Sequence, residues 1–323
     1  MSRARMQGGE EKKMSKFGTV HIDAALSNVS VGYRNAGFIA ERVFPVVPVG
    51  KQSDKYFVSG KEIFRVRDDR RAAGAEARES RWTLSNDTFF CSGHALKDYV
   101  PREDQVNADP QLDLLTDTTE VLTDQVLLAE EAALVTALAA GATAASQATT
   151  HWDDDDIDPF AIIEAQKLVI AKKIGKMPNV LALSAPVASA LKLNANVRQL
   201  VTGAGNVAAA LVTMAQIAAY LEVDEVVVGN AVYDTVNEGQ TASLNFVWGE
   251  YGLLFYRPPN PGRKTTSLGY TFQWNGAFGA GQGQFVNRYY WQPNLADVVE
   301  VHKYYDQKLV DTGAGILFTD CLT

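Results

Sequence analysis

The sequence predicts an α+β fold in which one long helix packs on an antiparallel sheet beside a central α/β unit. Three patterns predict it. Residues 109–140 carry the longest helical periodicity in the chain, residues 157–240 alternate between helical and strand patterns, and residues 241–323 hold aromatic strand candidates separated by turn residues. With 323 residues, 46% of them hydrophobic, the chain is long enough to bury a core.

The N-terminal part predicts an extended arm over residues 1–50, because Gly, Asn and two prolines interrupt its single apolar residues. The first sixteen residues are polar and lack the apolar centre of a secretory signal. Residues 54–69 and 81–93 then have strand character and flank a polar, Arg-rich segment. We expect a long hairpin over residues 51–94 with a mobile tip. It should lie on another surface, because an isolated two-stranded ribbon is only marginally stable.

The long helix predicted over residues 109–140 begins at Asp109 and Pro110, an N-cap and first-turn pair, and ends before Gly141. At 1.5 Å per residue it is roughly 45 Å long. No Lys or Arg lies inside it, yet four acids follow one stripe at spacings of four, three and four residues: Asp113, Asp117, Glu120 and Asp124. Like charges at these spacings destabilise a helix by about 0.2–0.5 kcal/mol per pair, and an external basic partner would relieve that repulsion.

Charge is segregated along the chain. The formal net charge is −8 and the isoelectric point about 5.1, which argues against a dedicated nucleic-acid binder. Residues 51–81 hold nine basic residues against six acids, a net of +3, whereas residues 97–164 hold sixteen acids against two basic residues, a net of −14. Either the two segments are unrelated solvated faces, or the basic stretch of one copy lies on the acidic stretch of another. In the second case the contact candidates are the four helix acids and four loop arginines: Arg65, Arg67, Arg70 and Arg71.

The central unit opens with a second cap pair, Asp158 and Pro159, which begins a helix predicted to end near Gly175. A strand over residues 177–184 follows, with further helices and a strand predicted over residues 186–193, 206–221 and 223–234. The remaining strand candidates predict a closing antiparallel sheet, and its expected packing partner is the long helix. These strand candidates are residues 244–258, 267–276, 284–292, 297–310 and 315–322.

Two motif matches suggest chemistry and have a plainer interpretation. Gly203 and Gly205 fit the glycine frame of a dinucleotide site, but the segment before them is a poor core strand, so we expect a Gly-rich loop before a helix. The triplet Asp311, Thr312 and Gly313 matches the aspartic-protease signature. Too few residues follow it to complete such a site, and we expect a β-turn.

Metal, thiol and membrane signals are equally weak. The acids of residues 153–156 beside His151 offer oxygen ligands but cannot all face one ion, so a solvated loop or a helix N-terminus is expected. Cys91 and Cys321 form neither a disulfide framework nor a metal cluster, which fits a reducing cytosol. No apolar window approaches the length of a membrane span. The sequence therefore predicts no catalytic residue, no cofactor and no metal site.

The order of these parts resembles the major capsid protein of tailed bacteriophages, a fold shared with bacterial nanocompartment shells. The resemblance covers essentially the whole chain, and two segments carry it locally: GFIAERVFPVVPVGKQSDKYFV at residues 37–58 and ALKDYVPREDQVNADPQLDLLTDTTEVLTDQVLLAEE at residues 95–131. It implies an N-terminal arm over residues 1–50, an extended loop over 51–94, a peripheral domain over 95–156 with a spine helix at 109–140, an axial domain over 157–240, and the peripheral-domain sheet and C-terminus over 241–323.

The resemblance also implies function. It implies a structural protein, not an enzyme, that self-assembles into pentamers and hexamers of an icosahedral capsid. The capsid encloses double-stranded DNA without sequence-specific contacts, in a virion assembled in the host cytoplasm. In the family the extended loop of one subunit lies over the peripheral domain of its neighbour, which agrees with the charge segregation.

The implied partners are a portal, in some members a decoration protein and, because the arm begins within the first fifty residues, a separate scaffolding protein. Two alternatives remain open. One is a bacterial nanocompartment shell, and the other is a nucleotide-binding oxidoreductase built around Gly203 and Gly205.

Overall fold

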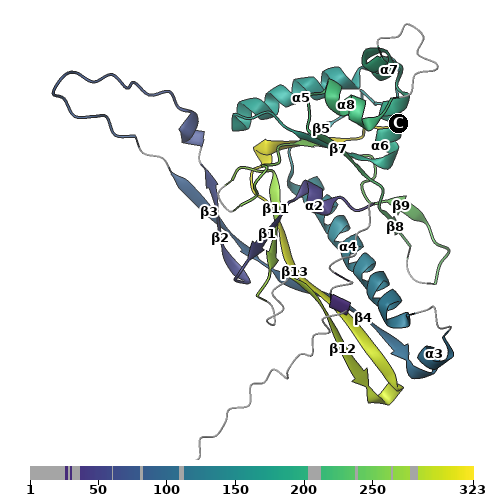
Figure 1. Cartoon of the computed structure of the whole chain (residues 1–323). Helices are drawn as coiled ribbons and strands as arrows, with labels where there is room; N and C mark the ends of the chain where they lie inside the picture. Colours follow the sequence, from purple (N-terminus) through teal and green to yellow (C-terminus); the bar gives the residue numbers. More distant parts are fainter. Residues whose placement is uncertain are drawn as a thin grey trace, which may run out of the picture.

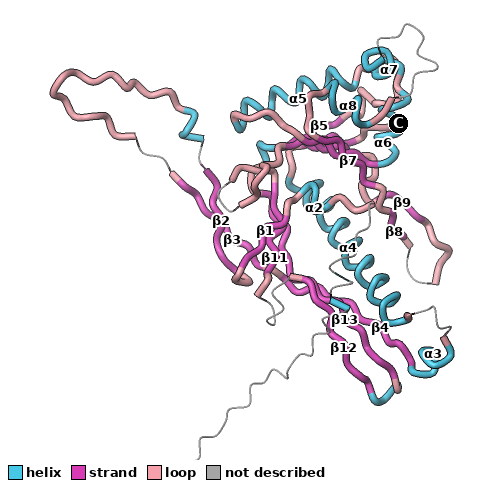
Figure 2. Tube along the Cα trace, in the orientation of Figure 1, coloured by secondary structure: helices cyan, strands magenta, loops and turns pink. Residues whose placement is uncertain are grey.

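Two five-stranded sheets, one long helix and a projecting hairpin organise the molecule (Figure 1). The computed structural model describes the chain over these ranges: residues 26–27, 30, 37–59, 61–80, 83–108, 113–202, 212–236, 239–262, 265–276 and 283–323. Helix and strand occur together in both halves of the molecule (Figure 2), so the α+β prediction is confirmed.

The first sheet, here called the long sheet, is built around one fourteen-residue strand, β13 (Ala296–Leu309). Strand β13 pairs antiparallel with three others, and a short strand near the N-terminus adds in parallel at the edge. These partners are β4 (Ser92–Pro101), β11 (Gly269–Trp274), β12 (Gln284–Trp291) and, beside β11, β1 (Val46–Val49). Buried and half-buried residues alternate along much of β13, as expected of a strand with one face on a core.

The long helix, α4 (Leu114–Gly141), crosses from one core to the other. Its N-terminal half packs on the long sheet, where Leu122 and Val126 contact Val299 and neighbouring valines. Its C-terminal half enters the core of the second sheet through Leu134 and adjoining residues. The predicted partnership of the helix with a sheet is therefore correct, but the helix serves two sheets rather than one.

The predicted start of α4 at Asp109 is wrong. The helix begins at Leu114, because the carboxylate of Asp113 accepts hydrogen bonds from the backbone N–H groups of Leu115 at 3.2 Å and Thr116 at 3.4 Å. A short helix, α3 (Arg102–Asn107), precedes it, and Asp109 and Pro110 lie outside the described residues. An N-cap is defined by where its side chain points, and several aspartates in this segment share the required residue type.

The second sheet, here called the short sheet, has the order β5-β14-β10-β6-β7. Its strands are β5 (Ala144–Ser146), β6 (Val180–Ser184), β7 (Glu225–Gly229), β10 (Gly252–Phe255) and β14 (Gly315–Thr319). The prediction that residues 241–323 form one closing sheet is thus wrong for β10 and β14. Strand β10 pairs with β14 on one side and with β6 on the other, so both strands belong to the short sheet. Every residue of β6 and β10 is buried, and such continuous burial is typical of central strands covered on both faces.

Four helices accompany the short sheet: α5 (Pro159–Ile174), α6 (Ala185–Leu193), α7 (Ala195–Thr202) and α8 (Met214–Tyr220). The predicted cap of α5 is confirmed, since Asp158 accepts from Phe160 N at 3.0 Å and Gly175 ends the helix at a left-handed φ of 69°. Helix α8 is shorter than predicted, and residues 203–211 lie outside the described part of the chain.

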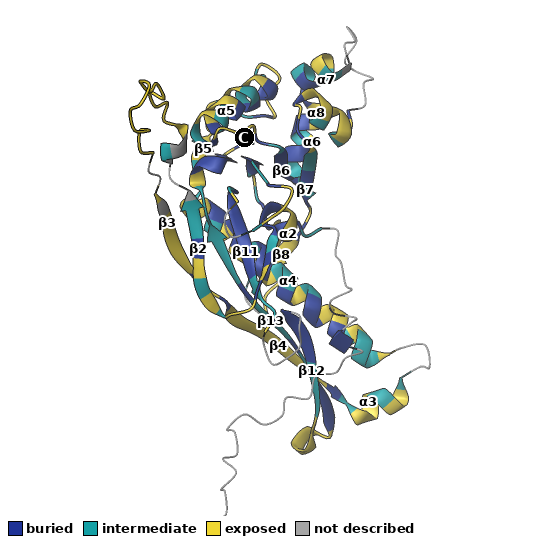
Figure 3. Cartoon of the chain, turned by 60° about the vertical axis from the view of Figure 1, so that its left-hand side comes forward, coloured by how far each residue is buried: buried dark blue, intermediate teal, exposed yellow. Residues whose placement is uncertain are grey.

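The predicted hairpin is present as strands β2 (Ser53–Ser59) and β3 (Leu84–Phe90), paired antiparallel along their whole length, but the first strand is shorter than the predicted residues 54–69. Its base packs on the long sheet, where Tyr56 and Phe89 contact the ring of Phe272. A 3-10 helix, η1 (Lys61–Phe64), follows β2, and beyond it the chain projects from the body as an irregular loop (Figure 2). Figure 3 shows that this projecting loop is exposed throughout.

Small elements complete the fold: α2 (Ala40–Val43), the hairpin β8 (Val232–Asp234) and β9 (Leu244–Phe246), and the 3-10 helices η4 (Gln292–Asn294) and η5 (Thr312–Ala314). The predicted turn at Asp311 is confirmed, because its carboxylate accepts from Gly313 N at 2.8 Å. Packing is tight where the arm enters the long sheet. A Cβ at Gly269 would lie only 2.3 Å from the ring of Phe44, so this position has no room for a side chain.

Candidate assembly surface

The loop arginines lie in the exposed segment between η1 and β3. Within this segment the carboxylate of Asp68 makes two contacts. It accepts a hydrogen bond from Arg70 N at 3.1 Å and forms an ion pair with Arg78 at 3.0 Å. Exposed ion pairs of this kind contribute little to stability, typically below about 1 kcal/mol. The loop is therefore shaped weakly by its own contacts and presents its arginines outward: Arg65, Arg67, Arg70 and Arg71.

The acids of α4 are not equivalent. Asp117 and Glu120 are exposed and Asp124 is half-buried. Asp113 is the N-cap, and its carboxylate also accepts from the hydroxyl of Thr116 at 2.6 Å, a hydrogen bond that lowers the pKa of Asp113. Asp113 therefore stabilises the start of the helix and, because it is exposed, also carries charge at the surface.

Within one chain the arginines and the acids lie far apart. The loop projects from the edge of the long sheet, whereas the acidic end of α4 lies beside α3 at the opposite end of the molecule (Figure 1), and the turned view agrees (Figure 3). Contact between the two groups therefore requires two copies of the chain.

A buried ion pair joins α4 to the long sheet. The ammonium of Lys303 on β13 donates to Glu130 Oε2, and both side chains are 1% exposed. A third group, Glu41 Oε1 from α2, lies 3.6 Å from the same ammonium. Burial raises the pKa of Glu130, against the opposing attraction of Lys303. Among the described residues, Glu130 Oε1 has no hydrogen-bond partner, so one buried oxygen of this carboxylate is unsatisfied.

The next residue of the helix joins α4 to the arm and to the other core. Glu131 accepts from Ile39 N at 3.0 Å and Ala40 N at 2.7 Å, and from the indole Nε1 of Trp248 at 2.5 Å. Burial raises the pKa of Glu131, and these three hydrogen bonds lower it. Since Glu131 and Trp248 are both buried, the carboxylate satisfies donors that would otherwise be stranded away from water.

The sequence analysis missed both glutamates, although a signal was present. Glu130 and Glu131 are the only charged residues between Asp124 and Gly141, in a stretch otherwise made of Ala, Leu, Val, Gln and Thr. A charged pair in such a stretch indicates buried, paired carboxylates, since unpaired charges are rarely buried. The partner Lys303 lies at a buried position of β13, on the face of the strand that packs on the core.

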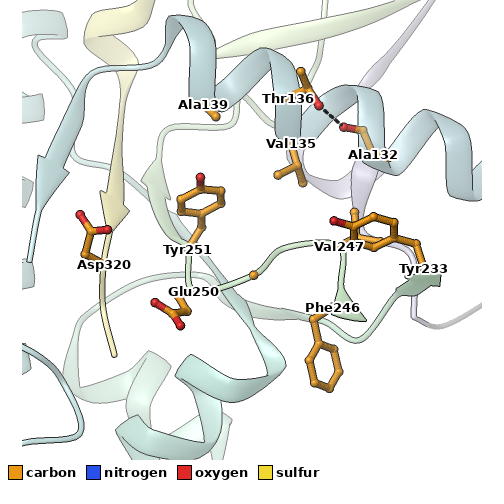
Figure 4. Close-up of a pocket in the computed structure, with 11 residues that line it drawn as sticks. Ala132, Val135, Thr136, Ala139, Tyr233, Phe246, Val247, Glu250, Tyr251 and Asp320 are labelled. Carbon is orange, nitrogen blue, oxygen red and sulfur yellow. Dashed lines mark hydrogen bonds between the residues drawn. The ribbon is translucent and has the colours of Figure 1, made fainter. Parts of the chain in front are cut away.

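A cavity of about 600 Å³ lies beside the C-terminal half of α4 (Figure 4). One wall is the helix, with Ala132, Val135, Thr136 and Ala139. The opposite wall is formed by aromatic and acidic side chains from the β8–β9 hairpin, the turn after β9 and the end of β14, which include Tyr233, Phe246, Glu250, Tyr251 and Asp320. The β8–β9 hairpin, which lines the cavity, lies on a different side of the molecule from the projecting loop (Figure 1).

The residues examined for chemistry in the sequence can be placed where the structure describes them. No three His, Cys, Asp or Glu side chains there are grouped as metal ligands would be. Cys91 is buried, and burial raises the pKa of its thiol to about 12, which disfavours the thiolate form. The acids of residues 153–156 form an exposed loop, as predicted, and Gly203 and Gly205 lie outside the described residues.

The helices in the described ranges include none with the length and apolar content needed to cross a bilayer. A long exposed loop and a helix shared between two sheets are features that this chain has in common with proteins that build shells. Comparisons with known proteins agree with this class. No family model matches the sequence.

Two curated relatives define the family. The major capsid protein of Burkholderia phage BcepMu is 31% identical over 79% of this chain and 84% of its own length. That of Pseudomonas phage JBD67 is 30% identical over 78% and 83%. The chain belongs to the family of phage major capsid proteins, which are structural proteins of the virion.

Solved structures share the fold. A phage-related protein from Bordetella bronchiseptica superposes with a TM-score of 0.71 at 28% identity, covering 94% of this chain and 99% of that one. The capsid of cyanophage P-SCSP1u gives a TM-score of 0.56 at 11% identity, covering 97% and 94%. The predicted capsid fold and the structural role in a capsid are thereby confirmed.

Proposed function

We propose that this chain assembles into the pentamers and hexamers of an icosahedral capsid that encloses double-stranded DNA, and that it catalyses no reaction. The observation that carries the proposal is the projecting basic loop, whose arginines are exposed and lie far from the acids of α4 in the same chain. In this proposal the loop of one subunit lies on α4 of its neighbour, and complementary charge sets the register between them.

The proposal assigns parts of the chain to roles in the shell. Residues 1–50 serve as the arm, 51–94 as the extended loop and 157–240 as the centre of the axial domain, to which β10 and β14 add two strands. The long sheet with α4 serves as the peripheral domain. The chain functions in the virion after assembly in the host cytoplasm, with a portal, a separate scaffolding protein and a decoration protein as proposed partners.

Of the alternatives raised by the sequence, a nanocompartment shell receives less support than a phage capsid. A virus-like particle from Pyrococcus furiosus superposes with a TM-score of 0.56 at 10% identity, whereas both curated relatives are phage proteins. The oxidoreductase alternative rests on glycines outside the described residues and gains no support from the relatives.

Charge reversal tests the loop contact. We expect the variant with Glu at all four loop arginines to fold, because those side chains are exposed, and to lose assembly into shells viewed by electron microscopy. Adding Lys at Asp117 and Glu120 should restore part of the assembly. Asp113 is left unchanged in this rescue, because its loss would remove the cap of α4 at a cost of about 1 kcal/mol.

The matched control moves the same compensating charge elsewhere. Lys at the exposed Asp154 and Asp156 changes net charge equally but leaves α4 acidic, and it should not restore assembly. Normal shells from the loop variant, or equal rescue by both lysine pairs, would contradict the proposed contact.

A further inference from the structure

The cavity beside α4 has the composition of a site for a cationic and apolar peptide segment. Ala132 and Ala139 present small side chains on the helix wall and leave room above the backbone. Tyr233 and Tyr251 offer aromatic rings on the facing side, and such rings attract the guanidinium of arginine as well as apolar carbon.

Two carboxylates supply the negative charge of this site. Glu250 and Asp320 both line the cavity, and both raise the pKa of the buried Cys321 thiol by their charge, so their fields converge on one region. The carboxylate of Asp320 is held in place, because its Oδ2 accepts from the hydroxyls of Ser146 at 3.0 Å and Thr319 at 2.9 Å. A fixed carboxylate beside aromatic rings recognises arginine at little cost in side-chain entropy.

The chain itself contains a segment of matching chemistry. Val66 is 97% exposed, and Arg65 and Arg67 flank it in the projecting loop. In its own chain this segment points away from α4. We propose that residues 65–67 of a second copy occupy the cavity, with the valine against the helix wall and the arginines toward Glu250 and Asp320. This inference rests on the proposed contact between the loop of one subunit and α4 of the next.

The spacing along helix and loop allows the cavity and the acidic residues of α4 to be contacted together. Asp117 and Val135 are about five turns apart and lie on one line of the helix. From Thr136 to Asp124 the helix rises about 18 Å. An extended loop covers about 13 Å from Val66 to Arg70, and an arginine side chain spans the remainder. With residues 65–67 in the cavity, the same loop therefore brings Arg70 and Arg71 towards Asp124 and Glu120, whereas Asp117, about 28 Å from Thr136 along the helix, lies beyond their reach.

Disulfide trapping tests this register. The chain has two cysteines, both buried, so engineered surface thiols react without competition. Shells of the variant Val66→Cys with Thr136→Cys are expected to form disulfides between chains, seen as a ladder on a non-reducing gel, because a disulfide needs Cα atoms within about 7 Å. The matched control, Val66→Cys with Asp117→Cys, uses an exposed position about 28 Å along the same helix and should give no ladder.

The outcomes separate this inference from the proposed function. A ladder from the control pair alone would overturn the cavity register and leave the contact between loop and helix standing. Shells with no ladder from either pair would overturn the inference, and the charge-reversal experiment would then decide the contact itself.

A second variant does not depend on thiol chemistry. Thr136→Trp fills the cavity and should reduce the yield of shells at least fivefold, whereas Ala165→Trp, at an exposed position of α5, should not. Equal yields from both tryptophan variants would count against occupancy of the cavity.

Discussion

Removing the ammonium of Lys303 is expected to destabilise the chain strongly, because Glu130 would remain buried without a cation beside it. Both side chains are 1% exposed. Two unit charges 4 Å apart attract by about 4 kcal/mol at an effective dielectric constant of about 20. Breaking a buried pair by deleting one partner typically costs about 3–5 kcal/mol. Lys303→Met should therefore lower the free energy of unfolding by about that amount.

The opposite deletion should cost less. In Glu130→Leu the ammonium of Lys303 still lies 3.6 Å from Glu41, whose side chain is 46% exposed and can follow it toward solvent. The double variant buries no unpaired charge and should be within about 1 kcal/mol of the parent or more stable, because hydrophobic replacement of a buried pair is often neutral or stabilising.

Urea unfolding of the unassembled chain, followed by tryptophan fluorescence, measures all four members of this cycle. Burial raises the pKa of Glu130. Because the pKa of Glu130 is higher in the folded chain than in the unfolded chain, where it is about 4.5, its protonated form stabilises the fold below pH 4.5, and this stabilisation is lost as the pH rises. The cost of Lys303→Met should thus be smaller at pH 4 than at pH 7. Additive single effects, or a cost that is independent of pH, would refute the buried-pair argument.

Three further outcomes follow from buried groups. Burial raises the pKa of the Cys91 and Cys321 thiols to about 12. The unfolded chain therefore releases these protons from about pH 9 while the folded chain keeps them, so the urea concentration at the unfolding midpoint should fall between pH 9 and pH 12. An unchanged midpoint would contradict this. Glu131→Gln replaces an acceptor with a donor that faces other donors and should cost about 1–3 kcal/mol in urea unfolding, with faster protease cleavage around α2. Gly269→Ala should lower the melting temperature because its Cβ meets a buried phenylalanine ring, whereas Gly50→Ala, which has nothing within 4 Å of its Cβ, is the matched control and should fold with little change.

Elements that depend on local patterns were predicted from the sequence, although the start of α4 and the length of the first hairpin strand were not. The helix cap at Asp158, the hairpin of β2 and β3 and the long helix α4 each depend on local residue types at local spacings. The assignment of β10 and β14 failed for a different reason. Both are short apolar runs, and a run of this kind can join whichever sheet buries it, so its neighbours are decided by contacts distant in sequence.

The candidate surface was predicted as residue types but not as positions. The exposure of the loop arginines and of Asp117 and Glu120 followed from the charge pattern. The role of Asp113 did not, because an aspartate near a helix start serves equally well as a cap or as a surface charge until the helix boundary is known. The cavity beside α4 could not be predicted, since its walls come from segments more than ninety residues apart.

The two adjacent glutamates would suit α4 to the proposed role of receiving the loop of a neighbour. Glu130 fixes the helix to β13 of the long sheet, and Glu131 fixes it to α2 and to Trp248 in the core of the short sheet. Because consecutive residues on a helix point about 100° apart, one turn of α4 binds two different bodies at once. A neighbouring loop that packs on the exposed face of α4 would therefore meet a helix fixed to both sheets. Displacing this helix would break buried polar contacts on either side.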